Sequence, residues 1–264
     1  MPNNQRPETE GQGVPALSER ILYKDAECVV VNKLCGEAAE GAGKGMADLP
    51  VLLADALAAP EKDNPQGRGG FLPAAVHRLD VPVSGCCLFA RTPRALAFLN
   101  TCFSQSSNWD GETKRENVIE KHYWAITEIP PNGKIVPGSA ELVHWIKTDP
   151  KTNKSTAFDE PGADMKKGIL RYRILGRGDR YLFIDVELLT GRHHQIRAQF
   201  AKIGLHIKGD LKYGSKRSEK SGGIRLHAHS LSFPDPSSLE KRISVTALPP
   251  VRDNLWDSLL ECIE

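Results

Sequence analysis

A carboxylate that follows a basic pair is the first candidate for chemistry in this sequence. Asp80 comes shortly after His77 and Arg78, in the proline- and glycine-containing segment 77–85. Loops held by rigid strands often carry catalytic groups, and a carboxylate can act as a nucleophile or as a general base. Considered alone, however, this segment is explained better by an Asx-type turn beside an exposed arginine.

Three later segments contain residues that could assist Asp80. In 121–125, strand alternation places Lys121 and Tyr123 on one face, although Tyr123 alone is typical of a core aromatic. In 190–197, Arg197 lies early in a predicted helix directly after a strand, where its guanidinium could bind a carboxylate bidentately. The last segment, 226–233, alternates like a half-buried strand.

The elements expected to position these segments are mainly strands joined by short turns. Periodicity, caps and turn residues predict strands at 28–32, 85–90, 122–126, 141–146, 170–175, 182–189 and 226–233, and helices at 49–59, 94–103 and 194–203. The polar stretch 105–117 and the charged stretch 147–155 are predicted as a loop and a turn. This pattern predicts an α+β fold, with a mainly antiparallel mixed sheet flanked by helices.

The chain is expected to form one catalytic domain over residues 18–264, after a disordered polar arm over residues 1–17. The arm lacks the apolar core of a secretory signal, and no stretch approaches the roughly 18 apolar residues of a membrane span. The six cysteines form no C-x-x-C pair, which is typical of thiols in a reducing compartment. We therefore expect a cytoplasmic protein that is not bound to a membrane.

Positive charge gathers in one part of a nearly neutral chain. The formal net charge is +2, but residues 190–225 contain nine Lys or Arg against two acids, a balance of 9 − 2 = +7. A basic zone of this kind indicates a polyanionic partner such as nucleic acid. A solvated charged face is the alternative explanation.

Together the four segments resemble the RluA family of RNA pseudouridine synthases. The family pattern H-R-L-D-x-x-(T/S)-S-G corresponds to residues 77–85, K-x-Y-x-A to 121–125 and T-G-R-x-H-Q-(I/L)-R to 190–197. Two further patterns, G-x-x-I-x-G-D-x-x-Y-G and L-H-A-x-x-L-x-F, correspond to 204–214 and 226–233. The resemblance covers residues 21–248 in the family's order.

The resemblance implies an isomerase that converts uridine to pseudouridine in ribosomal or transfer RNA, without a cofactor or a metal. Asp80 would be the essential carboxylate, which either attacks C1′ or removes the C2′ proton. Arg197 would pair with Asp80, and Tyr123 would stack on the base and assist proton removal at C5. Substrate contacts would come from His77, Arg78, Lys121, Arg192, Gln195 and Leu226, with Arg78 filling the stack that the flipped uridine leaves.

Two residues depart from the family pattern. Leu34 follows Lys33 where the family usually has proline, so that turn is expected to differ. Val83 replaces the usual threonine and removes a hydroxyl near Asp80, but it leaves the carboxylate itself in place.

The sequence also allows three other functions. The first is an RNA-binding protein of the same fold without catalysis, which the joint presence of Asp80, Tyr123 and Arg197 disfavours. The second is a metal-dependent hydrolase built from the histidines, which lacks acidic partners and an H-E-x-x-H helix. The third is a phosphate-binding loop at 41–45, which lacks the required spacing. Nothing in the sequence indicates an oligomer, so we expect a monomer.

Overall fold

The computed structural model describes residues 15–41, 48–58, 71–109, 118–130 and 136–263. The strands are β1 (Ile21–Lys24), β2 (Cys28–Lys33), β3 (Ala74–Ala75), β4 (Ser84–Ala90), β5 (Glu120–Glu128), β6 (Ser139–Asp149), β7 (Lys154–Phe158), β8 (Lys166–Arg177), β9 (Tyr181–Leu188), β10 (Leu226–Asp235) and β11 (Ser238–Thr246). The helices are α1 (Leu49–Ala58), α2 (Pro93–Ser107), α3 (Gln195–Ile203) and α4 (Asn254–Glu261), with short 3-10 turns η1 (Leu17–Arg20) and η3 (Leu211–Tyr213).

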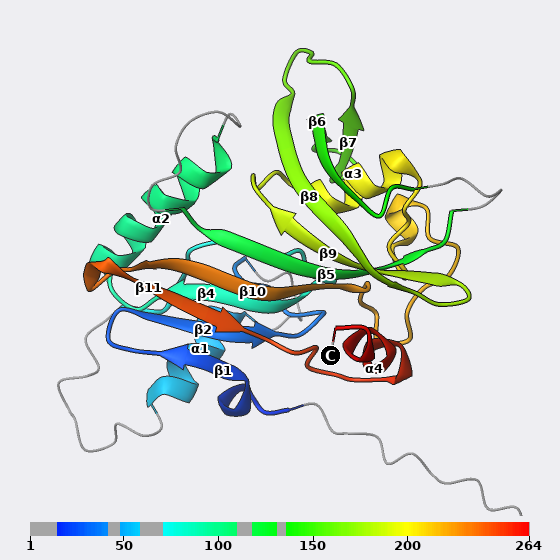
Figure 1. Ribbon diagram of the computed structural model, residues 1–264. Coiled ribbons are helices and arrows are strands. Elements are labelled where there is room, and N and C mark those ends of the chain that lie inside the picture. The colour runs from blue at the N-terminus through cyan, green and yellow to red at the C-terminus, as the bar shows by residue number, and fades with distance from the viewer. Residues whose placement is uncertain (1–14, 42–47, 59–70, 110–117, 131–135, 264) are drawn as a thin grey trace, which may run out of the picture.

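All the described strands belong to one sheet. Its order is β1-β2-β4-β10-β5-β9-β8-β6-β7, while β11 pairs with β10 and β3 with β4. Only β10 and β4 pair in parallel, and every other described pair is antiparallel. Figure 1 shows this sheet as a long curved surface, with α3 beside β6 and β7. The prediction of an α+β fold with a mainly antiparallel mixed sheet is therefore confirmed.

Strands β2 and β4 are buried on both faces, whereas β6 and β7 alternate buried and exposed residues. In β4, Cys87 and Phe89 pack into one core cluster, while Cys86 and Leu88 pack into another. Successive side chains of a strand point to opposite faces, which explains why the two adjacent cysteines lie in different clusters. The first cluster also contains Tyr123, so the candidate site lies on that face of the sheet.

The parallel β4–β10 contact depends on a glycine. Gly85 has φ +117°, and a β-carbon there would lie 2.5 Å from the backbone nitrogen of Ala228 and closer still to its carbonyl oxygen. Only glycine combines this backbone conformation with such a close approach. The last residue of segment 77–85 is therefore required for strand pairing directly behind Asp80.

We expect Gly85→Ala to lower the free energy of unfolding by about 3 kcal/mol or more, because overpacking adds to backbone strain. Urea unfolding followed by circular dichroism measures this change. Gly138→Ala is the matched control, since nothing lies within 4 Å of the added carbon. Equal stability of the two variants would contradict this explanation of Gly85.

Several predicted boundaries need correction. Helix α2 begins as expected, with Thr92 as the N-cap and Pro93 in the first turn, but it extends to Ser107 and takes in the first part of the predicted 105–117 loop. Residues 110–117 of that loop lie outside the described part of the chain. The predicted turn 147–155 is too long, because β6 continues to Asp149 and β7 begins at Lys154.

The predictions for the two ends of the chain and for α3 also differ in part from the structure. No element is predicted after 226–233, whereas the structure has β11 and α4, which complete the fold after β10. Leu17, assigned to the arm, begins η1 and packs against the core, whereas residues 1–14 lie outside the described residues. Helix α3 ends at Gly204 with φ +89°, as predicted, but His194 lies just before the helix with φ +52°. No helix in the described ranges is long and apolar enough to cross a membrane.

Candidate active site

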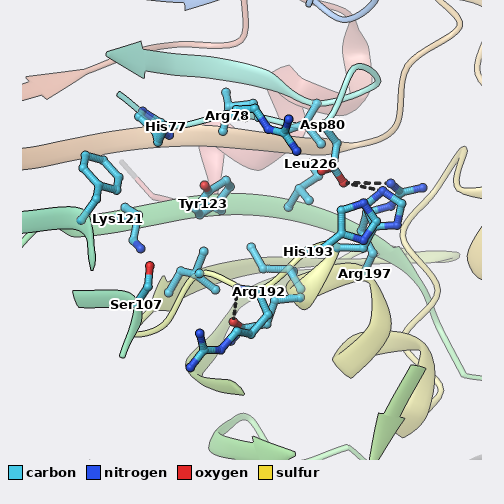
Figure 2. Close-up of a pocket in the computed structure, with 18 of the residues that line it drawn as sticks. His77, Arg78, Asp80, Ser107, Lys121, Tyr123, Arg192, His193, Arg197 and Leu226 are labelled. Carbon is cyan, nitrogen blue, oxygen red and sulfur yellow. Dashed lines mark hydrogen bonds and ion pairs between the residues drawn. The ribbon is translucent and has the colours of Figure 1, made fainter. Parts of the chain in front are cut away.

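A pocket of about 380 Å³ opens on the face of the sheet that carries Tyr123. Its lining comes from the loop before β4, the end of α2, β5, the start of α3 and the start of β10. Each residue predicted for the site lines it: Asp80, Tyr123, Arg197, His77, Arg78, Lys121, Arg192, Gln195 and Leu226. Figure 2 shows these side chains around the cavity, with Asp80 facing Arg197.

The loop that carries Asp80 is fixed by its backbone carbonyls. The Val83 amide donates to the Asp80 carbonyl at 2.9 Å, and the Ile224 amide donates to the Pro82 carbonyl at 3.0 Å. The Lys33 ammonium donates to the carbonyls of Leu34 (2.8 Å), Val81 (3.2 Å) and Val83 (2.8 Å). Burial lowers the pKa of Lys33 to about 8. Leu34, where the family usually has proline, also donates its amide to Glu37 Oε2 at 2.8 Å, a bond that proline could not make.

Arg197 joins two carboxylates. Its Nη1 lies 2.8 Å from Asp80 Oδ2, while its Nε and Nη2 lie 2.7 and 2.8 Å from the two carboxylate oxygens of Asp210. The bidentate partner is therefore Asp210, which the sequence did not single out, and the bond to Asp80 is a single one. Burial disfavours the charged guanidinium, but the hydrogen bonds and charge of Asp210, together with the charge of Asp80, raise the pKa of Arg197 above its usual value.

Burial differs between the two carboxylates. The side chains of Arg197 and Asp210 are 6% and 2% exposed, whereas that of Asp80 is 25% exposed. Asp210 therefore anchors the guanidinium inside the protein, and Asp80 remains accessible from the pocket. A buried charge pair needs such multiple hydrogen bonds to offset the loss of hydration.

Tyr123 and Leu226 belong to the apolar part of the pocket lining. Both are buried, and they lie on the adjacent strands β5 and β10. Burial first, and then the charge of Asp80, raises the pKa of Tyr123 above its ordinary value. The phenol is therefore neutral at physiological pH. This surface can stack against a planar base beside the carboxylate.

His77 and Gln195 are held by protein groups. His77 Nε2 accepts the Leu88 amide at 3.1 Å, and its ring stacks on Phe103 with 4.8 Å between centroids. Burial and then the charge of Lys121 lower the pKa of His77 to about 3, so this ring is a neutral wall. Gln195 Oε1 accepts from Thr190 Oγ1 and from the Arg192 amide, and its Nε2 donates to a backbone carbonyl. These bonds favour a positioning role for Gln195.

The remaining cations have different environments. Arg78 is exposed at the pocket and pairs with Glu40 at 3.2 Å. Lys121 is buried on β5, with its ammonium 5.8 Å from the centroid of the Phe103 ring. Arg192 donates through Nε to the Lys167 carbonyl at 2.9 Å, and burial lowers its pKa. Both Lys121 and Arg192 thus bring positive charge into the pocket lining.

Fewer cations of the basic zone 190–225 are free to bind a polyanion than its charge count indicates. Arg197 is bound to Asp80 and Asp210, Lys202 to Asp159, Lys208 to Glu219, and Arg225 to Glu219 and Asp253. Four exposed cations remain over this stretch without an ion pair among the described residues: Lys212, Lys216, Arg217 and Lys220. The zone is therefore partly an internal ion-pair network.

The histidines do not form a described metal centre. Within the described ranges, no group of three or more His, Cys, Asp or Glu side chains could hold a metal ion. His227, for example, is fully buried, and its two ring nitrogens contact Ser84 Oγ and the Ala247 carbonyl. Residues 42–45 of the glycine-rich stretch lie outside the described residues.

The comparisons with known proteins agree on one family. The RNA pseudouridylate synthase family matches residues 27–202. An uncharacterised RNA pseudouridine synthase of Zymomonas mobilis is 32% identical over 241 residues, which cover 90% of this chain and 96% of that protein. The mitochondrial RNA pseudouridine synthase 4 of Arabidopsis thaliana is 30% identical, with 74% of this chain and 40% of that protein covered.

Two further relatives extend the match. Ribosomal large subunit pseudouridine synthase C of Vibrio cholerae is 28% identical, with 96% of this chain and 72% of that protein covered. The solved structure of human RNA pseudouridylate synthase domain containing 1 aligns with a TM-score of 0.63 and 22% identity, covering 94% of this chain and 89% of that one. This structural likeness supports the fold.

Proposed function

The chain belongs to the RNA pseudouridylate synthase family, and on that premise we propose that Asp80 is the carboxylate with which it isomerises uridine in RNA. The observation that supports this role is the contact between Arg197 and an Asp80 side chain that remains accessible from the pocket. The reaction breaks the N1–C1′ bond, turns the base and joins C5 to C1′. The C5 proton is lost and N1 gains a proton, so atoms and electrons balance without a cofactor.

Asp80 can act in either of two ways. Its carboxylate can attack C1′ to form a covalent sugar ester, or it can remove the C2′ proton to form a glycal. Both require a carboxylate oxygen that reaches the ribose while the other oxygen is held. The ion pair with Arg197 provides that orientation.

Tyr123 is proposed to support the base and to assist loss of the C5 proton. Because its pKa is raised, the phenol enters the reaction neutral. A neutral phenol can take the C5 proton only if it passes its own proton to another acceptor. Asp80 can be that acceptor once C5 has joined C1′, so Tyr123 would act as a relay.

We expect Tyr123→Phe to lower kcat by about 100-fold or more, the usual size of a general acid–base contribution. The RNA dissociation constant should change little, because the ring is retained. Single-turnover kinetics and a filter-binding assay separate these quantities. A variant with kcat close to the wild-type value would exclude the hydroxyl from the rate-limiting proton transfer.

The substrate is proposed to be a uridine flipped out of its stack. Flipping costs a few kcal/mol and is easiest in loops and single-stranded segments. Arg78, which is exposed at the pocket, is proposed to occupy the vacated stack, and its exposure supports this role. Lys121 and Arg192 can neutralise backbone phosphate next to the target nucleotide, while His77, Gln195 and Leu226 shape the pocket.

We infer that the target RNA is ribosomal or transfer RNA. The printed name of the Vibrio cholerae relative assigns that protein to the large ribosomal subunit, which favours ribosomal RNA here. A cytoplasmic location is supported by six free cysteine thiols. We propose that the protein acts as a monomer, in one catalytic domain over residues 18–264.

The direct test uses unmodified RNA labelled with tritium at uridine C5, since pseudouridine formation releases that hydrogen as water. Purified protein should release tritium from ribosomal or transfer RNA that lacks pseudouridine. Binding of both RNAs without tritium release would instead indicate an inactive RNA-binding protein of the same fold.

A further inference from the structure

Both described contacts of the Asp80 carboxylate fall on the same oxygen. Oδ2 lies 2.8 Å from Arg197 Nη1 and 3.4 Å from His194 Nε2. Within the described part of the chain, no group is bonded to Oδ1. The described contacts thus hold the carboxylate at Oδ2, in a residue that lines the pocket.

A chain of hydrogen bonds favours one tautomer of His194. The Ser155 backbone amide donates to the Tyr213 hydroxyl oxygen at 2.8 Å, and that oxygen lies 2.9 Å from His194 Nδ1. Since the phenol oxygen already accepts from Ser155, its own proton is best directed to Nδ1. A neutral imidazole that accepts at Nδ1 carries its proton on Nε2, which faces Asp80.

The surroundings keep the His194 ring neutral and in place. Burial lowers its pKa to about 4; the charge of Asp80 acts in the opposite direction, whereas Arg197, His193 and Lys212 also favour the neutral form. The ring stacks on His193 at 3.8 Å and meets the edge of Tyr213 at 5.6 Å. The His194 backbone adopts φ +52°, a conformation that residues other than glycine seldom use and that is frequent at functional sites.

We propose that His194 is a positioning residue for Asp80: its neutral imidazole, oriented by Tyr213, directs the Nε2 proton toward Oδ2 across 3.4 Å, and this approach shortens to a hydrogen bond when substrate binds, so that Oδ1 is presented to the ribose. This inference rests on the proposed role of Asp80 and adds a residue to it. Arg197 provides the positive charge that pairs with Asp80, and His194 approaches the same carboxylate oxygen from a second direction. Tyr213 links this arrangement to β7 through Ser155.

Histidine ¹⁵N–¹H correlation spectra test the tautomer in the intact protein. Between pH 6 and 8 the His194 signal, assigned by its loss in His194→Gln, should show a neutral ring protonated on Nε2. Tyr213→Phe should shift the Nδ1 resonance, because the hydrogen bond that Nδ1 accepts is lost. A ring protonated on Nδ1, or a doubly protonated ring at pH 7, would overturn the proposal.

Kinetics test the consequence for catalysis. His194→Leu should lower the single-turnover rate roughly 10- to 100-fold, the effect of losing a hydrogen bond to a charged group, with little change in RNA affinity. His194→Gln, which keeps an N–H donor near the Nε2 position, should retain most of the rate. Both variants share the backbone strain of His194, so thermal unfolding of the pair controls for folding. Equal rates for the two variants would contradict a donor role.

A double-mutant cycle separates this role from a purely structural one. Tyr213→Phe should slow the wild-type reaction, but it should have no further effect in the His194→Gln background. Additive effects would show that Tyr213 does not act through His194. His122→Leu is the matched control, because His122 lies 3.7 Å from Asp185 outside the pocket lining.

These outcomes are distinct from failure of the proposed function. If the wild-type protein released no tritium from any RNA, the role of Asp80 would fail first. If the wild-type protein were active and His194→Leu were equally active, only the inference about His194 would fail.

Discussion

Asp80→Asn is expected to abolish turnover while leaving RNA binding largely intact. The amide is close to the carboxylate in size, but it can neither attack C1′ nor remove a proton. The loss should reach about four orders of magnitude or more, as for other essential catalytic groups. Tritium release measures the reaction, and a binding assay at fixed salt measures the RNA affinity.

Asp80 is one-quarter exposed, and its loop is fixed by backbone carbonyls rather than by its carboxylate. The variant should therefore fold with nearly wild-type stability. Multiple turnovers by a preparation free of wild-type protein would show that another group performs the chemistry. Asp55→Asn is the matched control, since Asp55 lies on α1 and outside the pocket lining.

Arg197→Ala is expected to remove activity and to destabilise the protein. Asp80 would lose its closest partner, and Asp210 would remain buried without a described partner. Leaving one charge of a buried pair uncompensated typically costs about 3–5 kcal/mol. Urea unfolding and the single-turnover rate measure the two effects.

The two effects can be separated by removing both buried charges. Arg197→Met combined with Asp210→Leu should recover most of the lost stability, because apolar replacement of a buried pair is often neutral or stabilising. It should not recover activity, since Asp80 still lacks its partner. If the double variant regained near-normal kcat, the Asp80–Arg197 contact would not be needed for catalysis.

The residues predicted for the site line one pocket because their motifs mark the ends of strands and the beginning of a helix. Asp80 precedes β4, Tyr123 lies within β5 and Leu226 begins β10. The parallel β4–β10 contact and the antiparallel β10–β5 contact bring these three together. Alternation and turn residues are local signals, so the strands were found even though their order in the sheet was not.

The sequence could not show which acidic residue pairs with each Lys or Arg. Asp210 and Arg197 both stood in recognised patterns, yet only the fold shows that they form the bidentate pair. Likewise, the +7 balance of residues 190–225 gave no indication that Lys208 and Arg225 are bound to Glu219. His194 is a fixed position of the 190–197 pattern, but the sequence assigns it no role beyond the disfavoured metal site, because its tautomer depends on Tyr213 and Ser155 from other segments.

The most direct measurement is pseudouridine mapping of ribosomal and transfer RNA from cells that lack this gene, complemented with the wild-type or the Asp80→Asn protein. We expect one or a few pseudouridines to be missing without the gene and to return only with the wild-type protein. Restoration of those pseudouridines by Asp80→Asn, or an unchanged map in cells without the gene, would contradict the proposed role of this carboxylate.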